Sequence, residues 1–182
     1  MIFITVGTDM PFDRLIRTVD QWARSSARED CFAQIGEGGW RPSHIRHSEF
    51  LEPPEFKRLL AEARIVIAHA GMGTILSALQ AEKPLLVMPR HAALGEQRND
   101  HQIATARELE RKLNLAVAYD ETDLLEHLDR VDELMAAPPI APFAGADLQG
   151  AIRDFIVSFG PSAKPQSSPL LRNNHGKNPW FA

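Results

Sequence analysis

Short apolar runs alternate with helical patterns along most of this chain. The apolar runs predict strands at residues 2–6, 31–35, 45–51, 65–68, 85–88 and 115–119. Between them, apolar residues recur at the spacing of one helix face, which predicts helices over residues 12–23, 55–63, 74–81, 101–113 and 123–135. Continuous apolar strands that alternate with helices are typical of a parallel sheet covered on both faces. We therefore predict a doubly wound, Rossmann-like α/β fold.

Length and composition indicate one domain followed by a tail. With 182 residues, 44% of them hydrophobic, the chain can bury one good core but is short for two domains of ordinary size. Apolar residues between Leu148 and Phe159 predict a last amphipathic helix. From Gly160 onward the chain is rich in Pro, Ser and Asn and has few residues able to form a core. We expect a domain over residues 1–159 and a disordered tail over residues 160–182.

Charge and cysteine content narrow the function classes. The formal net charge of −4 gives no overall basic field, so a nucleic-acid partner is not expected. Cys31 is the one cysteine, which excludes an intramolecular disulfide and a cysteine zinc cluster, and a reducing compartment is the simpler assumption. The first residues lack the basic region of a leader peptide, and no apolar stretch approaches the roughly 18 residues that span a bilayer. We expect a cytoplasmic location.

The strongest local signal is the run from His69 to Thr74, His-Ala-Gly-Met-Gly-Thr, which follows an apolar strand and opens a helix. Glycines permit a tight turn and a close approach of the backbone to a ligand, and the N-terminus of a helix favours an anion. We therefore interpret Gly71, Gly73 and Thr74 as a phosphate site. The alternative is that any strand-to-helix crossover needs a glycine turn. An NAD fingerprint is disfavoured, because its third glycine would fall at Leu76.

A second candidate loop, Gly7-Thr8-Asp9, follows the first predicted strand. Ligands of open α/β sheets bind at the carboxyl ends of strands, so Gly7 and Thr8 are candidates for the same phosphate site. The alternative for Asp9 is that it caps the helix that follows. The glycine-rich loop over residues 36–39 could approach a substrate, but a simple turn would have the same composition.

A third candidate is the polar run over residues 95–102, which enters a predicted helix. An N-cap at Asn99 with Gln102 in a capping box would explain part of it. Sugar hydroxyls bind well to carboxylates and amides, so the cluster suits a ribose and a hexose better than a metal. His69 is equally interpreted as a ligand contact or as a half-buried histidine that holds its loop. The candidate ribose and sugar contacts are His69, Glu96, Gln97, Asn99, His101 and Gln102.

Five motifs in order resemble the C-terminal domain of family-28 glycosyltransferases, over a match from Met1 to about Leu134. They are Val6-Gly7-Thr8, Gln34-Ile35-Gly36, His69-Ala70-Gly71-Met72-Gly73-Thr74, Lys83-Pro84-Leu85 and Asn99-Asp100-His101-Gln102. The chain is similar to the catalytic subunits of two-subunit UDP-N-acetylglucosamine transferases and to bacterial exopolysaccharide counterparts. The resemblance implies the donor-binding half of a GT-B fold, with the UDP diphosphate at Gly71, Gly73 and Thr74. It also implies ribose and sugar contacts from Glu96, Asn99, His101 and Gln102, although Asp100 interrupts the family's Asn-His-Gln pattern.

The same resemblance implies a partner subunit. Two-domain enzymes of this family place an acceptor half before the donor half, whereas here Met1 leads directly into the first predicted strand. We expect a membrane-associated partner to supply the acceptor half and to bring this chain to the cytoplasmic membrane face. The expected reaction is inverting transfer of a hexose from a UDP-sugar to a lipid-linked saccharide, with no cofactor or metal. The alternatives are a non-catalytic nucleotide-sugar-binding or regulatory module and, disfavoured by the chain length, a nucleotide-sugar epimerase.

Overall fold

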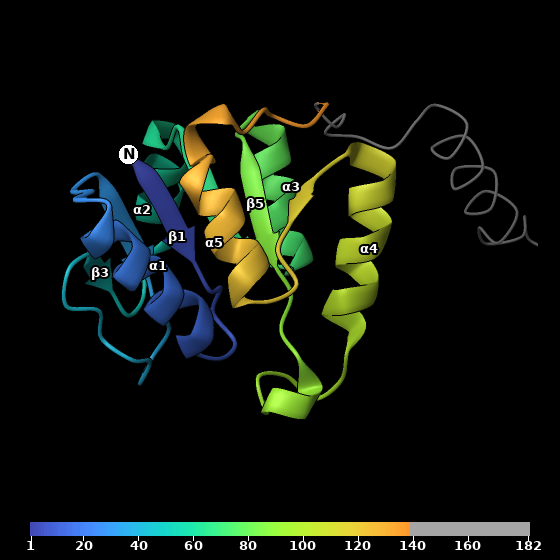
Figure 1. Cartoon of the computed structure of the whole chain (residues 1–182), viewed down its shortest axis with the longest axis horizontal. Coiled ribbons are helices and arrows are strands. Elements are labelled where there is room, and N and C mark those ends of the chain that lie inside the picture. Colours follow the sequence, from blue (N-terminus) through green and yellow to red (C-terminus); the bar gives the residue numbers. More distant parts are fainter. Residues whose placement is uncertain (139–182) are drawn as a thin grey trace, which may run out of the picture. The chain divides into compact units, whose positions relative to one another are not determined.

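The computed structural model describes residues 1–138, which are built around a six-stranded sheet with the order β3-β2-β1-β4-β5-β6 (Figure 1). Every strand pairing in it is parallel. This is the strand order of a Rossmann-like, doubly wound sheet, as the sequence predicts. The strands are β1 (Ile2–Thr5), β2 (Cys31–Gln34), β3 (Arg46–Ser48), β4 (Ile65–His69), β5 (Leu85–Met88) and β6 (Ala116–Val117).

Helices cover both faces of the sheet, and each face has its own core. On one face, α1 and α5 pack over alternate strand residues such as Ile4 and Ile67. On the other face, α2, α3 and α4 pack over the intervening residues such as Phe3 and Val66. Figure 1 shows α1 and α5 together in front of the strands. The helices are α1 (Asp13–Ser25), α2 (Pro53–Glu62), α3 (Met72–Gln80), α4 (His101–Leu113) and α5 (Glu121–Asp129).

Every predicted strand and helix within the described residues is present, but several are shorter than predicted. The strand predicted over residues 45–51 is only β3, because it pairs on one side alone, with Phe32 to Gln34 of β2. The helix predicted to reach residue 135 ends at Asp129 and is followed by a short 3-10 turn, η2 (Val131–Glu133). The predicted helix from Leu148 to Phe159 and the tail from Gly160 lie outside the described residues. No helix within residues 1–138 is long and apolar enough to cross a membrane.

A buried carboxylate attaches the loop before β3 to α1. Asp20 is 4% exposed and lies on the buried face of α1. Its oxygens accept hydrogen bonds from the backbone N–H groups of Ser43, His44 and Ile45 at 2.9–3.1 Å, and from the Ser43 hydroxyl at 3.2 Å. Burial by itself raises the pKa of the Asp20 carboxyl, but these donors outweigh it and hold the pKa below its usual value. One carboxylate thus fixes the path of the chain into the edge strand.

Asp20→Asn is expected to lower the free energy of unfolding by roughly 2–3 kcal/mol near neutral pH, because an amide cannot satisfy these donors as a carboxylate does. The folded pKa lies below the unfolded one. The stabilisation is therefore complete above the unfolded pKa and disappears as the pH falls through the folded pKa. Urea denaturation of both proteins from about pH 7 to about pH 3 measures this. A stability difference that stays constant over that range would contradict the assignment.

Candidate nucleotide-binding site

A cavity of about 800 Å³ lies at the carboxyl ends of β1 and β4 and extends between α2 and α3. Its polar mouth is formed by residues that the sequence predicts as a phosphate site, and the structure brings all of them together with His69. These lining residues are Gly7, Thr8, His69, Gly71, Gly73 and Thr74. Its inner walls are mainly apolar and include Phe50, Leu51, Phe56, Leu60 and Ala61. The cavity thus joins a glycine-rich mouth to an apolar groove.

The N-terminus of α3 opens into this cavity. The helix begins at Met72. Its N-cap is Gly71, which has no side chain that could cap the helix. The amide of Ile75 donates to the carbonyl of Gly71 at 3.1 Å. In this geometry the N–H groups of Met72, Gly73 and Thr74 have no partner inside the helix. Free amides and the positive end of the helix dipole favour an anion at this position.

The two glycines of the predicted phosphate site have different roles. Gly71 gives room for the His69 ring, since a Cβ placed on Gly71 would lie 2.1 Å from His69 Nε2. A Cβ on Gly73 would meet no atom within 4 Å, and Gly73 does not adopt a positive φ. The expectation that Gly73 is needed for a tight turn is therefore wrong. Its missing side chain instead leaves the first turn of α3 open to the cavity.

His69 is confined between two stretches of backbone. A Cβ on Gly7, which has a φ of +77°, would lie 2.5 Å from the His69 ring. Burial and the nearby Arg90 cation lower the pKa of His69 to about 4, so the ring is neutral at neutral pH. Its Nδ1 is buried and makes no hydrogen bond within the described residues. The ring both packs against the β1 and β4 loops and faces the cavity.

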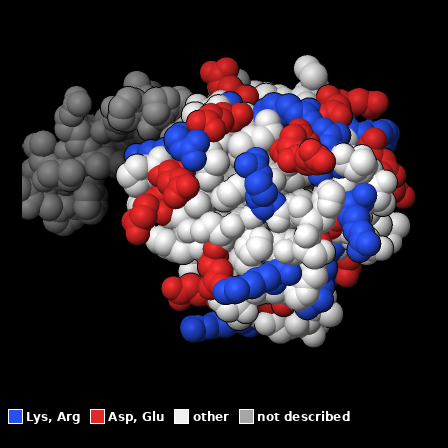
Figure 2. Space-filling model, turned by 90° about the vertical axis from the view of Figure 1, so that its left-hand side faces the viewer, with Lys and Arg blue, Asp and Glu red and all other residues white. Residues whose placement is uncertain are grey.

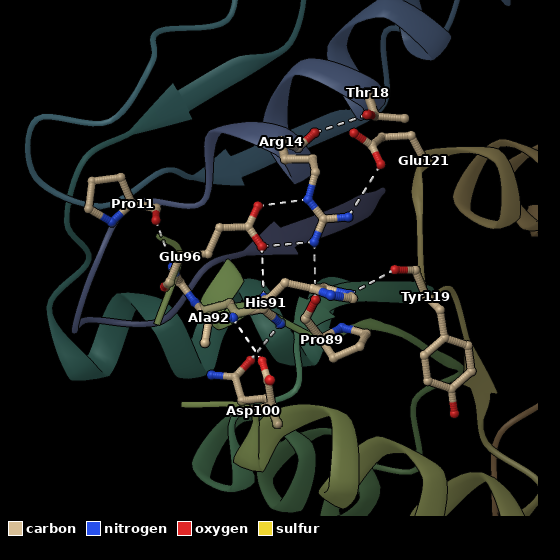
Figure 3. Close-up of polar contacts among 12 residues, drawn as sticks. Pro11, Arg14, Thr18, Pro89, His91, Ala92, Glu96, Asp100, Tyr119 and Glu121 are labelled. Carbon is tan, nitrogen blue, oxygen red and sulfur yellow. Dashed lines mark hydrogen bonds and ion pairs between the residues drawn. The ribbon is translucent and has the colours of Figure 1, made fainter. Parts of the chain in front are cut away.

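No residue of the predicted sugar-binding run lines this cavity, although Gln97 bonds to Asp9, which does. Two other members of the run are engaged within the protein. Glu96 accepts from Arg14 Nε and Nη2 at 2.7 and 2.8 Å and from the backbone N–H of His91 at 2.9 Å (Figure 3). Gln102 is 3% exposed and accepts from the backbone N–H of Arg90 at 3.2 Å. These contacts attach the loop after β5 to α1 and α4. A role for Glu96 or Gln102 at a sugar would require an exchange of these partners.

In the rest of the run, Gln97 is half-buried and the other residues are exposed. Gln97 donates to the Asp9 carboxylate at 3.4 Å, and Asn99 accepts from the backbone N–H of His101 at 3.1 Å. The predicted capping box is wrong, because Asp100 is the N-cap of α4 and Gln102 binds elsewhere. Asp9 does not cap α1, whose N-cap is Phe12. Sugar contacts by Gln97, Asn99 and His101 stay predictions. No metal-binding group of three His, Cys, Asp or Glu side chains lies within residues 1–138.

Sequence reasoning missed Arg90, the largest fully buried side chain of the described residues. Its guanidinium donates to the carbonyls of Val6, Met10, Pro11 and Glu96. It also lies 4.8 Å from the centre of the Phe12 ring. The available signal was the position of an arginine just after the end of a buried strand, at Met88-Pro89-Arg90. Arg90 connects the loop after β5 to the loop after β1.

The sequence profile of the glycosyltransferase family 28 C-terminal domain matches residues 1–149. The chain belongs to this family. Its fold is accordingly the C-terminal half of a GT-B fold, which confirms the fold class and the family predicted from the sequence.

Relatives of this family-28 domain include UDP-N-acetylglucosamine transferase subunits. The Homo sapiens subunit ALG13 is 33% identical over 124 residues, which cover 63% of this chain and 10% of that protein. The Yarrowia lipolytica subunit ALG13 is 29% identical over 136 residues, which cover 66% of this chain and 65% of that protein. The chain thus spans only a small part of the human relative and about two thirds of the yeast one.

Solved structures support the same fold. An NMR solution structure of ALG13 superposes with a TM-score of 0.53 at 18% identity, covering 83% of this chain and 93% of that one. The calicheamicin glycosyltransferase CalG4 gives a TM-score of 0.53 at 16% identity, covering 88% of this chain and 44% of that one. Os79 from O. sativa, solved in complex with UDP, gives a TM-score of 0.54 at 14% identity. The match covers 72% of this chain and 31% of that one. At these identities the likeness concerns the fold alone.

Gly71→Ala is expected to lower the free energy of unfolding by about 1–3 kcal/mol, because its Cβ would displace a ring that Gly7 confines on the other side. Gly73→Ala is the matched control in the same helix turn. It should leave stability unchanged or raise it by up to about 1 kcal/mol, because alanine is the better helix former.

Denaturant unfolding of both variants measures the difference. The cost of Gly71→Ala should shrink in a His69→Ala background, since the clash is with that ring. Equal effects of Gly71→Ala and Gly73→Ala would contradict the packing that we describe.

Proposed function

We propose that this chain is the donor-binding catalytic subunit of a two-subunit inverting glycosyltransferase that uses a UDP-sugar. The observation that carries the proposal is the shape of the cavity. Its mouth contains the open N-terminus of α3, and its interior continues as an apolar groove between α2 and α3. An anionic head joined to a flat aromatic group fits this arrangement, and a nucleoside diphosphate has that chemistry. Membership in family 28 supports the choice of a sugar nucleotide as ligand.

The diphosphate is proposed to lie at the mouth of the cavity. There the amides of Met72, Gly73 and Thr74 are free of helix hydrogen bonds, and the side chain of Thr74 lines the same wall. Gly7 and Thr8, in the loop after β1, line the same cavity. As the bond between the sugar and the diphosphate breaks, negative charge grows on the leaving diphosphate. Amides already oriented toward that charge stabilise it with little reorganisation.

The nucleoside is proposed to occupy the groove. Phe50 and Phe56 supply aromatic surface for a base, and Leu51 lines the same cavity. Ser77 and Gln80 add polar groups to the same lining. The Ser77 hydroxyl donates to the carbonyl of Gly73 at 2.8 Å, which leaves its oxygen able to accept another hydrogen bond.

The acceptor is proposed to come from a partner subunit. Glycosyl transfer needs a base within hydrogen-bond reach of the acceptor hydroxyl, on the side of the anomeric carbon opposite the diphosphate. His69 faces the cavity, but its ring is held between Gly7 and Gly71 and lies on the diphosphate side. A second protein surface would complete the site, and the relatives named above are themselves subunits. We further propose a lipid-linked saccharide acceptor at the cytoplasmic membrane face.

UDP is expected to raise the melting temperature of the chain more than GDP or ADP at equal concentration, because a ligand that binds the folded state stabilises it by mass action. Gly73→Asp should lower UDP affinity at least about tenfold, since a carboxylate would stand where the diphosphate binds. The same variant should not lose stability, because an acidic residue near a helix N-terminus is favourable.

Gly73→Asn is the control of matched shape without charge, and it should bind UDP better than Gly73→Asp. Calorimetric titration measures both affinities. Equal binding of UDP by the aspartate and asparagine variants would contradict the placement of the diphosphate at this helix end. Equal stabilisation by all three nucleotides would contradict the proposal of a UDP-sugar donor.

The purified chain is expected to transfer no sugar alone and to become active when membranes containing the partner are added. The assay follows labelled sugar from a UDP-sugar to a lipid-linked acceptor, with the Gly73→Asp variant as the inactive control. Turnover by the isolated chain would contradict the two-subunit proposal. Nucleotide binding without transfer in the assembled complex would support a non-catalytic binding module instead.

A further inference from the structure

The Arg90 guanidinium is a buried cation whose hydrogen bonds all go to neutral groups. Nη2 donates to the carbonyl of Val6 at 2.9 Å and to that of Met10, and Nη1 donates to the carbonyls of Pro11 and Glu96 at 2.6 and 3.2 Å. No carboxylate of the described residues forms an ion pair with it. The carboxylate of Glu96 is bonded to Arg14 and the amide of His91.

Such a charge is costly to bury. Burial lowers the pKa of the Arg90 guanidinium, and the more distant charges of Glu96 and Asp9 raise it by less. The side chain is nevertheless 1% exposed, and an arginine keeps its proton under these conditions. A cation without a carboxylate partner in a protein interior is unfavourable unless another group compensates for it. The four carbonyls do so only in part, because they carry no formal charge.

The position of Arg90 relative to the cavity suggests the missing compensation. Val6 and Met10, whose carbonyls bind the guanidinium, are the residues on either side of Gly7, Thr8 and Asp9. Those three residues line the cavity. The loop that binds the guanidinium is therefore the loop that lines the mouth of the cavity, and the Arg90 charge acts on His69, another lining residue. The carbonyl oxygens of Val6, Met10 and Pro11 in this loop are directed toward Arg90.

Resting on the proposed function, we infer that Arg90 is a positioning residue that supplies the fixed positive charge behind the diphosphate site. It acts through the loop of residues 6–11, without touching the nucleotide. Its charge attracts the diphosphate across the loop, and its hydrogen bonds hold the loop so that its carbonyls face away from the ligand. Inside a protein such an attraction is weakly screened by salt.

The side chains that line the cavity offer little to replace this charge. Figure 2 shows basic and acidic side chains interspersed over the face drawn there, with uncharged surface between them. Of the residues that line the cavity, Lys57 is the basic one, and it is exposed to solvent. Salt screens the attraction of an exposed lysine strongly. It screens the attraction of a buried arginine only weakly. The two sources of charge are therefore distinguishable by experiment.

The test compares Arg90→Lys, which keeps the charge, with Arg90→Gln, which removes it. Dissociation constants of UDP and uridine are measured for each variant and for the unmodified chain. Arg90→Gln is expected to weaken the binding of UDP at least about tenfold more than the binding of uridine, because uridine carries no charge. Arg90→Lys should keep the ratio of the two affinities within about threefold, even where the altered loop weakens both ligands. Equal losses of UDP and uridine in both variants would show a purely structural role and overturn the inference.

A second measurement needs no variant at Arg90 and covers the case in which those variants do not fold. UDP affinity of the unmodified chain should fall less than about fivefold between low and high salt, and Lys57→Gln should change it less than about threefold. A larger salt effect that disappears in Lys57→Gln would assign the charge to Lys57 and overturn the inference. Failure of the unmodified chain to bind UDP would overturn the proposed function as well. UDP binding with an unchanged ratio in Arg90→Gln would overturn this inference alone.

Discussion

The parallel pairing of β1 with β4 is the constraint on which the rest of the domain depends. Ile2 pairs with Ile65, and Thr5 pairs with Ala68, so the two strands end side by side. Their following loops, with Gly7 on one strand and His69 to Gly71 on the other, must then share one small volume. Glycine at positions 7 and 71 is what allows the His69 ring to fit there. The cavity, the free end of α3 and the loop around Arg90 all follow from this single register.

The sheet could be predicted from the sequence because its central strands are buried on both faces. Residues 65–68 are apolar without interruption, and a run of that kind between helical patterns has few alternatives. Strand ends were less predictable. Ile45 and Leu51 are buried like strand residues, yet Ile45 is held by Asp20 and neither lies in β3. Each belongs to one of the two hydrophobic cores, so both are buried although they lie in loops.

The candidate site also has a part that could be predicted from the sequence and a part that could not. The glycine turn before α3 was predictable because it is a local motif at a strand-to-helix junction. The roles of Glu96 and Arg90 were not, because their partners are distant in the sequence: Arg14 lies 82 positions from Glu96, and Val6 lies 84 positions from Arg90. Gln102 suited a capping box on spacing alone, but the backbone amide of Arg90 is its partner. Tertiary hydrogen bonds that join the loop after β5 to α1, α4 and the loop after β1 therefore account for most of what sequence reasoning missed.

The two outer strands of the described sheet have a further consequence. β3 has three residues and β6 has two, and β3 exposes the side chains of Arg46 and His47. The unpaired backbone of a sheet edge is a template on which strands of other molecules can add, and short edges with charged side chains are poor templates. The short outer strands and the exposed charge on β3 therefore disfavour edge-to-edge aggregation of this domain.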